Sequence, residues 1–532
     1  MWFFTEFPGK IVYDKGVYIL KCVLITQWKW TEVMRFFDRS SCQFVIIAMM
    51  LASLSACLVG PDFNTPKSPQ VTHYTKAPWP GRTVSAAGPG GASQQFIQAK
   101  SISAQWWRLF HSPKLNQLIC RGIANSPNLS AAKATLLEAQ EKLNAGIGNG
   151  LFPVVSAQLS AQRGSSAGFF NSNTANSTIT SDSVPTGSVF NLFNASVNVS
   201  YVPDIFGAAR RQIQGLQSQV MYQYFELRAA YLTLTANIVT SAITIASLHQ
   251  QIRVTQQLIR EQAEQLAIIK RQFELGGVSE IDVLAQQTQL AQTRASLPPL
   301  EKSWQQARHL LAVLVGAFPS DSHIIPPLRL EELHLPTKLP LSVPSALVRQ
   351  RPDIRAAEAL WEAANAQVGV ATANLYPQFS LNGTYGKSNT VGSHVLGSQT
   401  NLWSIGGALL QPIFQGGALS AERRAAIAAY NQAAAQYREV LLQAFKNVAD
   451  TLRALEADAR EMRAQKQAEL AAYANLNLVR QQFDLGGVSY LSLLDAQRQY
   501  QQTRINLIQA KASRYTDTAA LFQALGGGWW NC

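Results

Sequence analysis

Two long stretches of the chain have the pattern of helices that pack lengthwise on one another. No proline occurs between Asp204 and Leu297 or after Pro412, and both stretches are rich in Ala, Gln, Leu and Arg, which favour helix. In the first stretch, apolar positions recur at spacings of three, four and seven, including Leu248, Ile252, Ile259, Leu266 and Phe273. We predict long helices over about 207–275, 279–316, 417–485 and 489–525. A helix over 207–275 would measure about 100 Å at 1.5 Å per residue, so it must lie beside equally long neighbours.

A glycine pair separates the two helices of each stretch. Gly276-Gly277 and Gly486-Gly487 can adopt the positive φ angles that end an incoming helix. Ser279 and Ser489 can then cap the outgoing helix by accepting backbone N–H bonds. Each stretch is therefore expected to form a coiled hairpin whose tip reads Leu-Gly-Gly-Val-Ser.

The chain contains an internal duplication. Residues 271–297 and 481–507 share 14 identities in 27 aligned positions. Further landmarks recur in the same order, namely Pro203-Asp-Ile-Phe206 with Pro412-Ile-Phe414, and Leu151-Phe-Pro153 with Leu375-Tyr-Pro377. We interpret these as tandem copies of one unit, the first over 105–330 and the second over 331–526. An extended segment over 57–104 precedes them, and a tail over 527–532 follows.

Before each pair of long helices the hydrophobic period changes from 3.6 to 2. Val155, Leu159, Val197 and Tyr201 alternate with Ser, Gln and Asn, and Phe379, Leu381 and Tyr385 do so in the second unit. We predict strands over about 153–163, 192–203, 378–386 and 402–411. One apolar face and one uncharged polar face suit a barrel wall with lipid outside and water inside, and a soluble sandwich would show the same alternation. The export signal described below favours the barrel.

Four strands cannot span a membrane alone. A sheet of four strands has two open edges, and each unpaired backbone group in lipid costs several kcal/mol. The subunit must therefore oligomerise, and three copies would supply twelve strands, enough for a water-filled lumen. Periodicity alone does not fix the number of copies.

Composition excludes several classes of protein. The 532 residues are 47% apolar and 14% charged, which rules out disorder for most of the chain. Only one apolar run approaches the length of a membrane helix, about Phe44–Val59, so a helical-bundle transporter is excluded. The net charge of +13 is spread along the chain, which favours a solvated surface over a nucleic-acid patch.

The N-terminus has the pattern of an export signal. Arg35 and Arg39 precede the apolar run, which closes on Leu54-Ser-Ala-Cys57. This ending resembles the bacterial lipobox, in which the cysteine thiol is diacylated, although a plain signal peptide that contains a cysteine remains an alternative. We predict a signal over 34–56, a lipid on Cys57, and a doubtful upstream extension over 1–33 if translation starts at Met34. By the same resemblance, Leu58 in second place points to the outer membrane.

Few cysteines remain after processing at this site. Cys120 and Cys532 are left in the mature chain, so no disulfide scaffold is expected. Whether these two thiols pair is not decided by the sequence.

Together these motifs resemble the TolC family, and most closely its lipoprotein (NodT-like) branch. The resemblance runs from about Cys57 to Gly526 and is carried by the Phe-x-Leu-Gly-Gly-Val-Ser turns, the Pro-Asp-Ile-Phe-Gly and Pro-Ile-Phe-Gln-Gly-Gly joints, and Leu494-Asp-Ala-Gln-Arg498. It implies a mainly α protein with a membrane β-barrel: a homotrimer whose twelve-stranded barrel continues into a twelve-helix periplasmic barrel. It also implies docking onto a membrane-fusion adaptor and an inner-membrane pump, which is of the RND type in this branch.

The resemblance also implies a periplasmic gate. The family's constricting aspartate matches Asp495, with Arg498 three residues on, and the first unit has Ala285 at that position with Asp282 nearby. Phe483 stands where some relatives have a gate-bonding tyrosine. In a trimer each charge appears three times around the axis and could hold a closed aperture. The alternative is that Asp495 and Arg498 form an ordinary exposed ion pair, worth a few tenths of a kcal/mol.

The hairpin tips are the candidate adaptor-docking surface. They comprise Gly276, Gly277, Val278, Gly486, Gly487 and Val488. Paired glycines allow a partner helix to approach the backbone closely, and an equally supported interpretation is that they only cap helices.

No catalytic, metal or cofactor site is predicted. Gly164-Ser-Ser-Ala-Gly168 matches a nucleophile motif but is not followed by a predicted helix, and the seven histidines are scattered. The first hypothesis for function is therefore a passive exit duct for drugs or other small molecules. Alternatives are a duct for type I protein secretion and, from another class, a periplasmic coiled-coil tether. The only expected non-protein group is the lipid on Cys57.

Overall fold

The computed structural model of the chain describes residues 58–71, 73–75, 81–98, 102–166, 188–389, 391–392 and 401–529. The chain divides into two units, Met1–Leu58 and Val59–Cys532, and every described helix and strand belongs to the second. The predicted extension, signal peptide, lipidation site Cys57 and thiol Cys532 lie outside the described residues. Cys120 is a free, exposed thiol.

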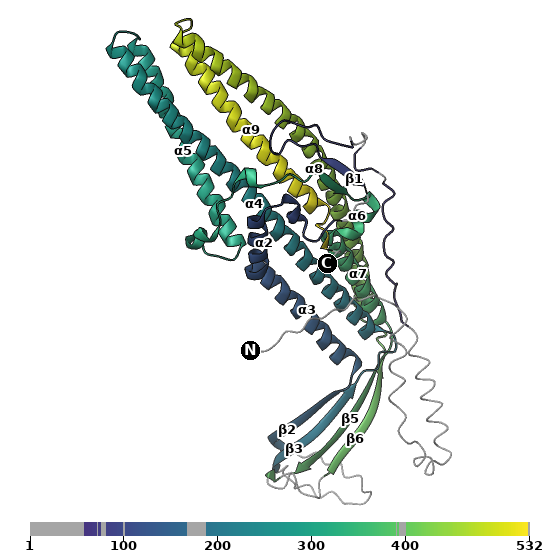
Figure 1. Ribbon diagram of the computed structural model, residues 1–532. Helices are drawn as coiled ribbons and strands as arrows, with labels where there is room; N and C mark the ends of the chain where they lie inside the picture. The colour runs from purple at the N-terminus through teal and green to yellow at the C-terminus, as the bar shows by residue number, and fades with distance from the viewer. Residues whose placement is uncertain are drawn as a thin grey trace, which may run out of the picture. The chain divides into compact units, whose positions relative to one another are not determined.

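Long helices dominate the unit. The first repeat contains α2 (Pro113–Asn125), α3 (Pro127–Leu151), α4 (Ala208–Glu274) and α5 (Glu280–Leu314). The second contains α6 (Pro344–Gln350), α7 (Pro352–Ala373), α8 (Ala418–Asp484) and α9 (Tyr490–Ala524). The four longest helices lie within two residues of the ranges expected from the sequence. They form two antiparallel hairpins, α4–α5 and α8–α9, whose tips lie at the same end of the unit (Figure 1).

A four-stranded antiparallel sheet lies at the other end (Figure 1). Its strands are β2 (Val154–Ser166), β3 (Ser188–Tyr201), β5 (Gln378–Asn389) and β6 (Asn401–Leu410), in the order β2-β3-β5-β6. β2, β3 and β5 extend three or four residues beyond the predicted ranges at the loop end, where Ser166 pairs with Ser188. The apolar alternation fades there, but backbone ladder bonds do not require apolar side chains, so the strands continue.

The middle of the unit contains elements that the sequence pattern did not predict. β1 (Gln95–Gln98) pairs in parallel with β4 (Lys338–Leu341), which comes more than 200 residues later. Short 3₁₀ helices η2 (Trp106–Phe110), η3 (Pro319–Ile324) and η4 (Leu330–Glu332) lie in the same part of the chain. The largest apolar core is here, and it includes the fully buried residues Trp106, Phe110, Ile119, Tyr515 and Phe522.

A buried arginine fastens the segment before β1 to α9. The Arg514 guanidinium donates to the carbonyl oxygens of Gly90 at 3.0 Å and Ala92 at 2.7 Å, and to the Thr83 hydroxyl at 3.2 Å. Because its side chain is fully buried, these bonds replace the water that the charge loses.

By length and composition, α4 is the one helix among the described residues that could cross a membrane. Its most apolar window is 61% buried inside the protein, which is also typical of a core helix. Residues of α4 such as Ile238 and Ile243 are buried in the apolar core of this unit.

Candidate functional site

The two faces of the sheet differ in chemistry. The register pairs apolar residues across the strands, such as Ala157 with Val197 and Tyr385 with Trp403, and polar residues on the other face, such as Gln158 with Ser196 and Asn198 with Thr384. The polar face forms a hollow of about 280 Å³ lined by residues that include Gln158, Ser160, Asn194, Ser196, Thr384 and Ser404. On the apolar face, Leu159, Trp403 and Ile405 are exposed. This arrangement suits a wall with water on its hollow side and lipid on the other.

Both outer strands of the sheet have an open edge within the described residues. β2 pairs only with β3, and β6 only with β5. A sheet with two unpaired edges is not stable in a membrane by itself, because its unpaired backbone groups would be exposed to lipid.

The joint between β3 and α4 is capped and packed inside the subunit. The Asp204 carboxylate accepts bonds from the backbone N–H groups of Ala209 and Arg210 at 3.1 and 2.9 Å, which satisfies donors at the start of α4. Ile205 is buried, and the Phe206 ring stacks on Tyr376 with centroids 4.9 Å apart and planes at 22°. Tyr376 lies in the joint between α7 and β5.

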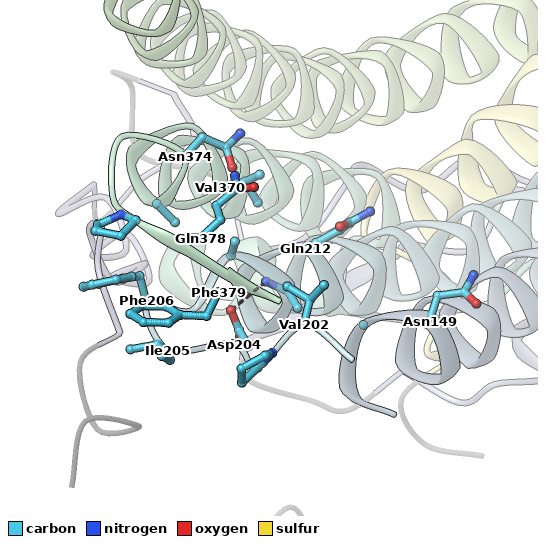
Figure 2. A pocket seen from close by; sticks show the side chains of 16 residues that line it. Asn149, Val202, Asp204, Ile205, Phe206, Gln212, Val370, Asn374, Gln378 and Phe379 are labelled. Atoms are coloured by element: carbon cyan, nitrogen blue, oxygen red, sulfur yellow. Dashed lines mark hydrogen bonds between the residues drawn. The ribbon is translucent and has the colours of Figure 1, made fainter. Parts of the chain in front are cut away.

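A cavity of about 400 Å³ lies between these two joints (Figure 2). Val202, Asp204 and Phe206 line it from the β3–α4 joint, Asn374 lines it from the α7–β5 joint, and Phe379 lines it from the start of β5. The cavity therefore lies where the two repeats meet, at the end of the sheet that joins the helices. This end is called the base of the sheet from here on.

The corresponding joint after β6 has no such packing within the described part of the subunit. Ile413 and Phe414 follow β6 as Ile205 and Phe206 follow β3, yet they are 95% and 87% exposed. The two copies of this joint thus differ in their packing: the copy after β3 is packed within the subunit, and the copy after β6 is exposed.

The two hairpin tips share one backbone geometry. Gly276 and Gly486 have φ angles of +77° and +72°, and each donates its N–H to a carbonyl three residues back, on Phe273 and Phe483 respectively, at 2.9 Å. Leu275 and Leu485, next to these glycines, are exposed.

The remaining predicted tip residues differ in exposure. Gly277 and Gly487 are exposed, whereas Val278 and Val488 are half-buried. Val278 packs against the apolar cluster described below. The glycines therefore end their helices and are also accessible to a partner.

Asp282 takes part in a capping box. Its carboxylate accepts bonds from the Ser279 N–H at 3.1 Å and the Ser279 hydroxyl at 2.7 Å, while the Ser279 hydroxyl accepts from the Asp282 N–H at 3.4 Å. At the other tip Ser492 occupies the corresponding position and Ser489 caps it at 3.4 Å. Asp282 thus has a local structural role besides the gate role that the resemblance implies.

Asp495 and Arg498 form an exposed pair on α9. The Arg498 guanidinium donates to the Asp495 carboxylate one turn back on the same helix. Within the subunit the pair is accessible to solvent, so its charges are available to groups outside the subunit.

A buried contact joins the two hairpins beside this pair. The Tyr490 hydroxyl donates to Gln286 Oε1 at 2.6 Å, and Gln286 Nε2 donates to the Gln262 carbonyl oxygen at 2.8 Å. Burial, and then the charge of Asp282, raises the pKa of Tyr490, so the phenol keeps its proton. The two hairpins of one subunit are therefore hydrogen-bonded to each other through α9, α5 and α4.

Phe483 belongs to an apolar cluster around this contact. The cluster, here called the tip cluster, has buried members Ile269, Val283, Tyr490, Leu493 and Leu494, with Phe483 half-buried at its side. The rings of Phe483 and Tyr490 lie 5.5 Å apart. Phe483 thus packs within the subunit, whereas the predicted gate residues Asp495 and Arg498 lie in solvent.

The sequence interpretation missed Tyr490 and Gln286. The aligned repeats carry a signal that could have identified them, because Tyr490 aligns with Glu280 and Gln286 with Ala496. Asp495 and Arg498 also align with different residues, Ala285 and Thr288. The two copies thus diverge at both partners of the contact and at both members of the exposed pair.

Among the described residues, no three His, Cys, Asp or Glu side chains lie close enough together to hold a metal ion. The nucleophile motif begins at Gly164 on β2, and its last two residues lie outside the described part.

A protein-family model described as outer membrane efflux protein matches residues 118–317 and 343–527. The chain is 28% identical over 492 residues to the toluene efflux pump outer membrane protein TtgC of Pseudomonas putida, covering 91% of this chain and 95% of that protein. It is 26% identical over 453 residues to SilC of Salmonella typhimurium, named "Probable outer membrane lipoprotein", covering 83% and 94% respectively.

Solved structures share the fold. The outer-membrane channel OprN is 27% identical and superimposes with a TM-score of 0.76, covering 89% of this chain and 100% of that one. The outer membrane protein VceC of Vibrio cholerae is 25% identical with a TM-score of 0.72, covering 80% and 100%. The long hairpins and the four-stranded sheet thus belong to an architecture seen in other outer-membrane proteins.

Proposed function

This chain belongs to the outer membrane efflux protein family, and from that premise we propose that three copies form the passive exit duct of a tripartite pump for small molecules. The resemblance to TolC-like channels and the outer-membrane location that the sequence predicts are confirmed. The chain is an outer-membrane efflux channel component, and by family such channels are not enzymes.

The observation that carries the proposal is the sheet with two open edges, an exposed apolar face and a polar hollow. Strand order β2-β3-β5-β6 leaves β2 and β6 unpaired among the described residues. Three such sheets joined edge to edge make a closed twelve-stranded barrel, and the even number preserves antiparallel pairing at every junction. A periplasmic tether would not need amphipathic strands.

The helical tips supply the proposed gate. Asp495 and Arg498 face solvent from α9, while the tip cluster holds α9 against the first hairpin. In a trimer, three copies of the pair would face the common axis, where bonds to neighbouring subunits could close the aperture. Asp282 contributes by fixing the start of α5, and Phe483 by packing beside Tyr490.

The tips also supply the proposed docking surface for a periplasmic adaptor. Leu275 and Leu485 are exposed beside Gly276 and Gly486. Each tip therefore has an exposed apolar side chain next to a turn of glycines that carry no side chain. Exposed leucines at the end of a hairpin suit contact with an apolar partner helix. The adaptor would connect the duct to an inner-membrane pump, of the RND type by the sequence resemblance.

We further propose that Cys57 carries the lipid anchor. The lipobox-like sequence supports it, and the relative SilC has a lipoprotein name. A diacylated cysteine with an acylated amine would hold the chain firmly, because a single acyl chain binds only marginally.

Small molecules are the proposed cargo. TtgC is named for toluene efflux, and the hollow on the polar face of the described strands is lined mainly by hydroxyl and amide side chains, such as those of Ser160 and Asn194. Such a surface suits passage without strong retention. No feature of the described residues favours protein secretion over this cargo.

Ion conduction in planar bilayers tests the proposal. Purified detergent-solubilised protein should insert and give discrete conductance steps, and Asp495→Ala or Arg498→Ala should raise the conductance because each removes closing bonds. Lys142→Ala, which removes a member of an exposed pair on α3, is the matched control. Absence of conduction by a trimeric preparation, including the gate variants, would refute the duct. Conduction that the two gate variants leave unchanged would refute the gate alone.

A further inference from the structure

Two aromatic residues from different repeats meet at the base of the sheet. Phe206 ends the Pro-Asp-Ile-Phe landmark after β3, and Tyr376 lies in the Leu-Tyr-Pro landmark before β5. Their rings stack with centroids 4.9 Å apart, five residues along each chain segment from Tyr201 and Leu381, the last register pair of β3 and β5 toward the helices. The stack therefore belongs to the junction between one repeat and the next.

The duplication provides a second copy of each partner. Phe414 ends the Pro-Ile-Phe landmark after β6, and Phe152 lies in the Leu-Phe-Pro landmark before β2. These residues follow the last strand and precede the first one, so they stand at opposite edges of the sheet. Within one subunit they cannot form the stack that their counterparts form.

Both residues are exposed in the subunit. Phe414 is 87% exposed and Phe152 is 61% exposed, and Ile413, beside Phe414, is 95% exposed although its counterpart Ile205 is buried. Phe, Tyr and Trp side chains each bury about 150–250 Å² when they pack, so leaving two of them in water forgoes a large apolar contact. The exposed residues lie beside the two unpaired strand edges.

We propose that Phe414 of one copy stacks on Phe152 of the next copy, reproducing between subunits the Phe206–Tyr376 stack. The proposal rests on the proposed oligomeric duct and specifies the contact that closes it. Strand direction supports it, because β6 is antiparallel to β5 and would be antiparallel to β2 of the next copy, as β3 is to β5. The occupant of the exposed aromatic edge is thus a second copy of this chain.

Three such stacks then form one ring at the base of the barrel. In a closed ring, Phe414 of each copy packs on Phe152 of the next copy. Neither of these two side chains is then left exposed at an open edge of a sheet. Three inter-subunit stacks would alternate with the three Phe206–Tyr376 stacks. The barrel would then contain the same kind of aromatic stack twice per subunit, once within the subunit and once between neighbouring subunits.

Cross-linking through paired cysteines tests the contact. In a background carrying Cys120→Ser and Cys532→Ser, the double variant Phe152→Cys/Phe414→Cys is treated in membranes with a short bismaleimide. Covalent dimers and trimers should appear on a denaturing gel, whereas each single-cysteine variant should remain monomeric. The matched control is Phe206→Cys/Tyr376→Cys, which should cross-link within one chain and leave its mass class unchanged.

A second measurement covers variants that assemble poorly. Phe152→Leu and Phe414→Leu keep apolar side chains, and each should lower the temperature at which the oligomer dissociates in detergent. Because both remove the same stack, the double variant should lower it by no more than about the larger single effect. Leu151→Met is a control at a neighbouring joint residue.

The outcomes separate this contact from the duct itself. An oligomer of three copies by native mass spectrometry without a covalent ladder, or with additive Leu effects, would overturn the stack and leave the duct standing. A monomeric protein would overturn both. A ladder that stops at dimers would contradict the closed ring.

Discussion

Arg211 on α4 donates to the carboxylate of Asp62 at 2.8 Å, although Arg211 is buried and Asp62 is exposed. The same guanidinium donates to the carbonyl oxygens of Val59 at 3.2 Å and Gly60 at 3.1 Å. Gly60 has φ of +93°, and a Cβ there would lie 2.6 Å from the Cα of Gly369. The first residues after the predicted lipidation site are therefore clasped onto the helices near the base of the sheet.

Arg211→Met should release this N-terminal segment. It removes three charge-assisted hydrogen bonds, and even one of them is worth about 1.5–3 kcal/mol, so the free energy for local detachment should fall by at least about 1.5 kcal/mol. Limited proteolysis should then cut within residues 59–75 more than tenfold faster, while the remaining protein keeps its helical signal. Lys142→Met, at an exposed pair on α3, should leave the cleavage rate unchanged. Equal rates in both variants would contradict the clasp.

Neighbouring residues on β2 should respond oppositely to a charge. Leu159→Arg places a cation on the exposed apolar face and should cost about 2–4 kcal/mol if that face contacts lipid near the bilayer midplane. Gln158→Arg places the same cation on the hollow polar face and should be tolerated. The yield of oligomer assembled into liposomes measures both. A loss of assembly by Gln158→Arg alone would mean that the faces are assigned the wrong way round.

The helices and strands were predictable because their signals are local. Proline-free stretches, glycine pairs and the period-2 alternation all act within a few residues, so they mark α4, α8 and the sheet. The contacts between Tyr490 and Gln286, and between Arg514 and Gly90, join residues more than 200 positions apart. No periodicity encodes which polar side chains meet across such distances, and the parallel pairing of β1 with β4 escaped prediction for the same reason.

The candidate site was predictable where its residues recur in both repeats or follow from local spacing, and not where they depend on the whole fold. Tip glycines recur in both repeats and are visible by comparison, and Asp495 with Arg498 was available from the family resemblance. The fit of Asp282 to Ser279 follows from spacing once α5 begins at Glu280. In contrast, the exposure of Phe414 depends on which strand lies at the sheet edge, and strand order is a property of the whole fold.

Separate substitutions at the two tip glycines distinguish docking from capping. Gly276 has a positive φ, so Gly276→Ala should strain the turn by about 1 kcal/mol. Gly277 does not, and an added Cβ would meet its nearest atom, the Gln272 carbonyl oxygen, at an ordinary 3.4 Å. If the tip docks an adaptor, Gly277→Asp should abolish export in cells at normal oligomer yield. If the glycines only cap, Gly276→Ala should do more harm than Gly277→Asp, and both should lower yield rather than transport.

Stability should fall as pH rises toward 7 because of Asp458 on α8. Burial, followed by the carboxylates of Asp517 and Glu461, raises the pKa of Asp458 to about 7, while Arg514 opposes the shift. A carboxyl whose pKa is higher in the folded than in the unfolded chain stabilises fully below the unfolded value, near 3.9, and this stabilisation is lost as pH approaches 7. Asp458→Asn should therefore flatten the change in unfolding temperature between pH 5 and pH 8. The same slope in the variant and the wild type would exclude Asp458 as its source.

Tyr490→Phe should loosen the contact between the hairpins without disturbing the rest of the fold. It leaves Gln286 Oε1 without the phenol donor in a buried site, a loss of about 1–3 kcal/mol, while the ring still fills the tip cluster. Gln262, buried alongside, already has side-chain amide atoms without a partner among the described residues, so separation of the hairpins would allow water to reach them. Because α9 also carries Asp495 and Arg498, the released state should conduct more, and mean conductance in planar bilayers should rise.

Tyr515→Phe is the matched control. It deletes another buried hydroxyl on α9, which is bonded to the Leu333 carbonyl oxygen at 2.8 Å and lies 25 residues beyond Tyr490. If both variants raise conductance equally, the effect comes from general destabilisation; if only Tyr490→Phe does, the bond between the hairpins helps to keep the channel closed.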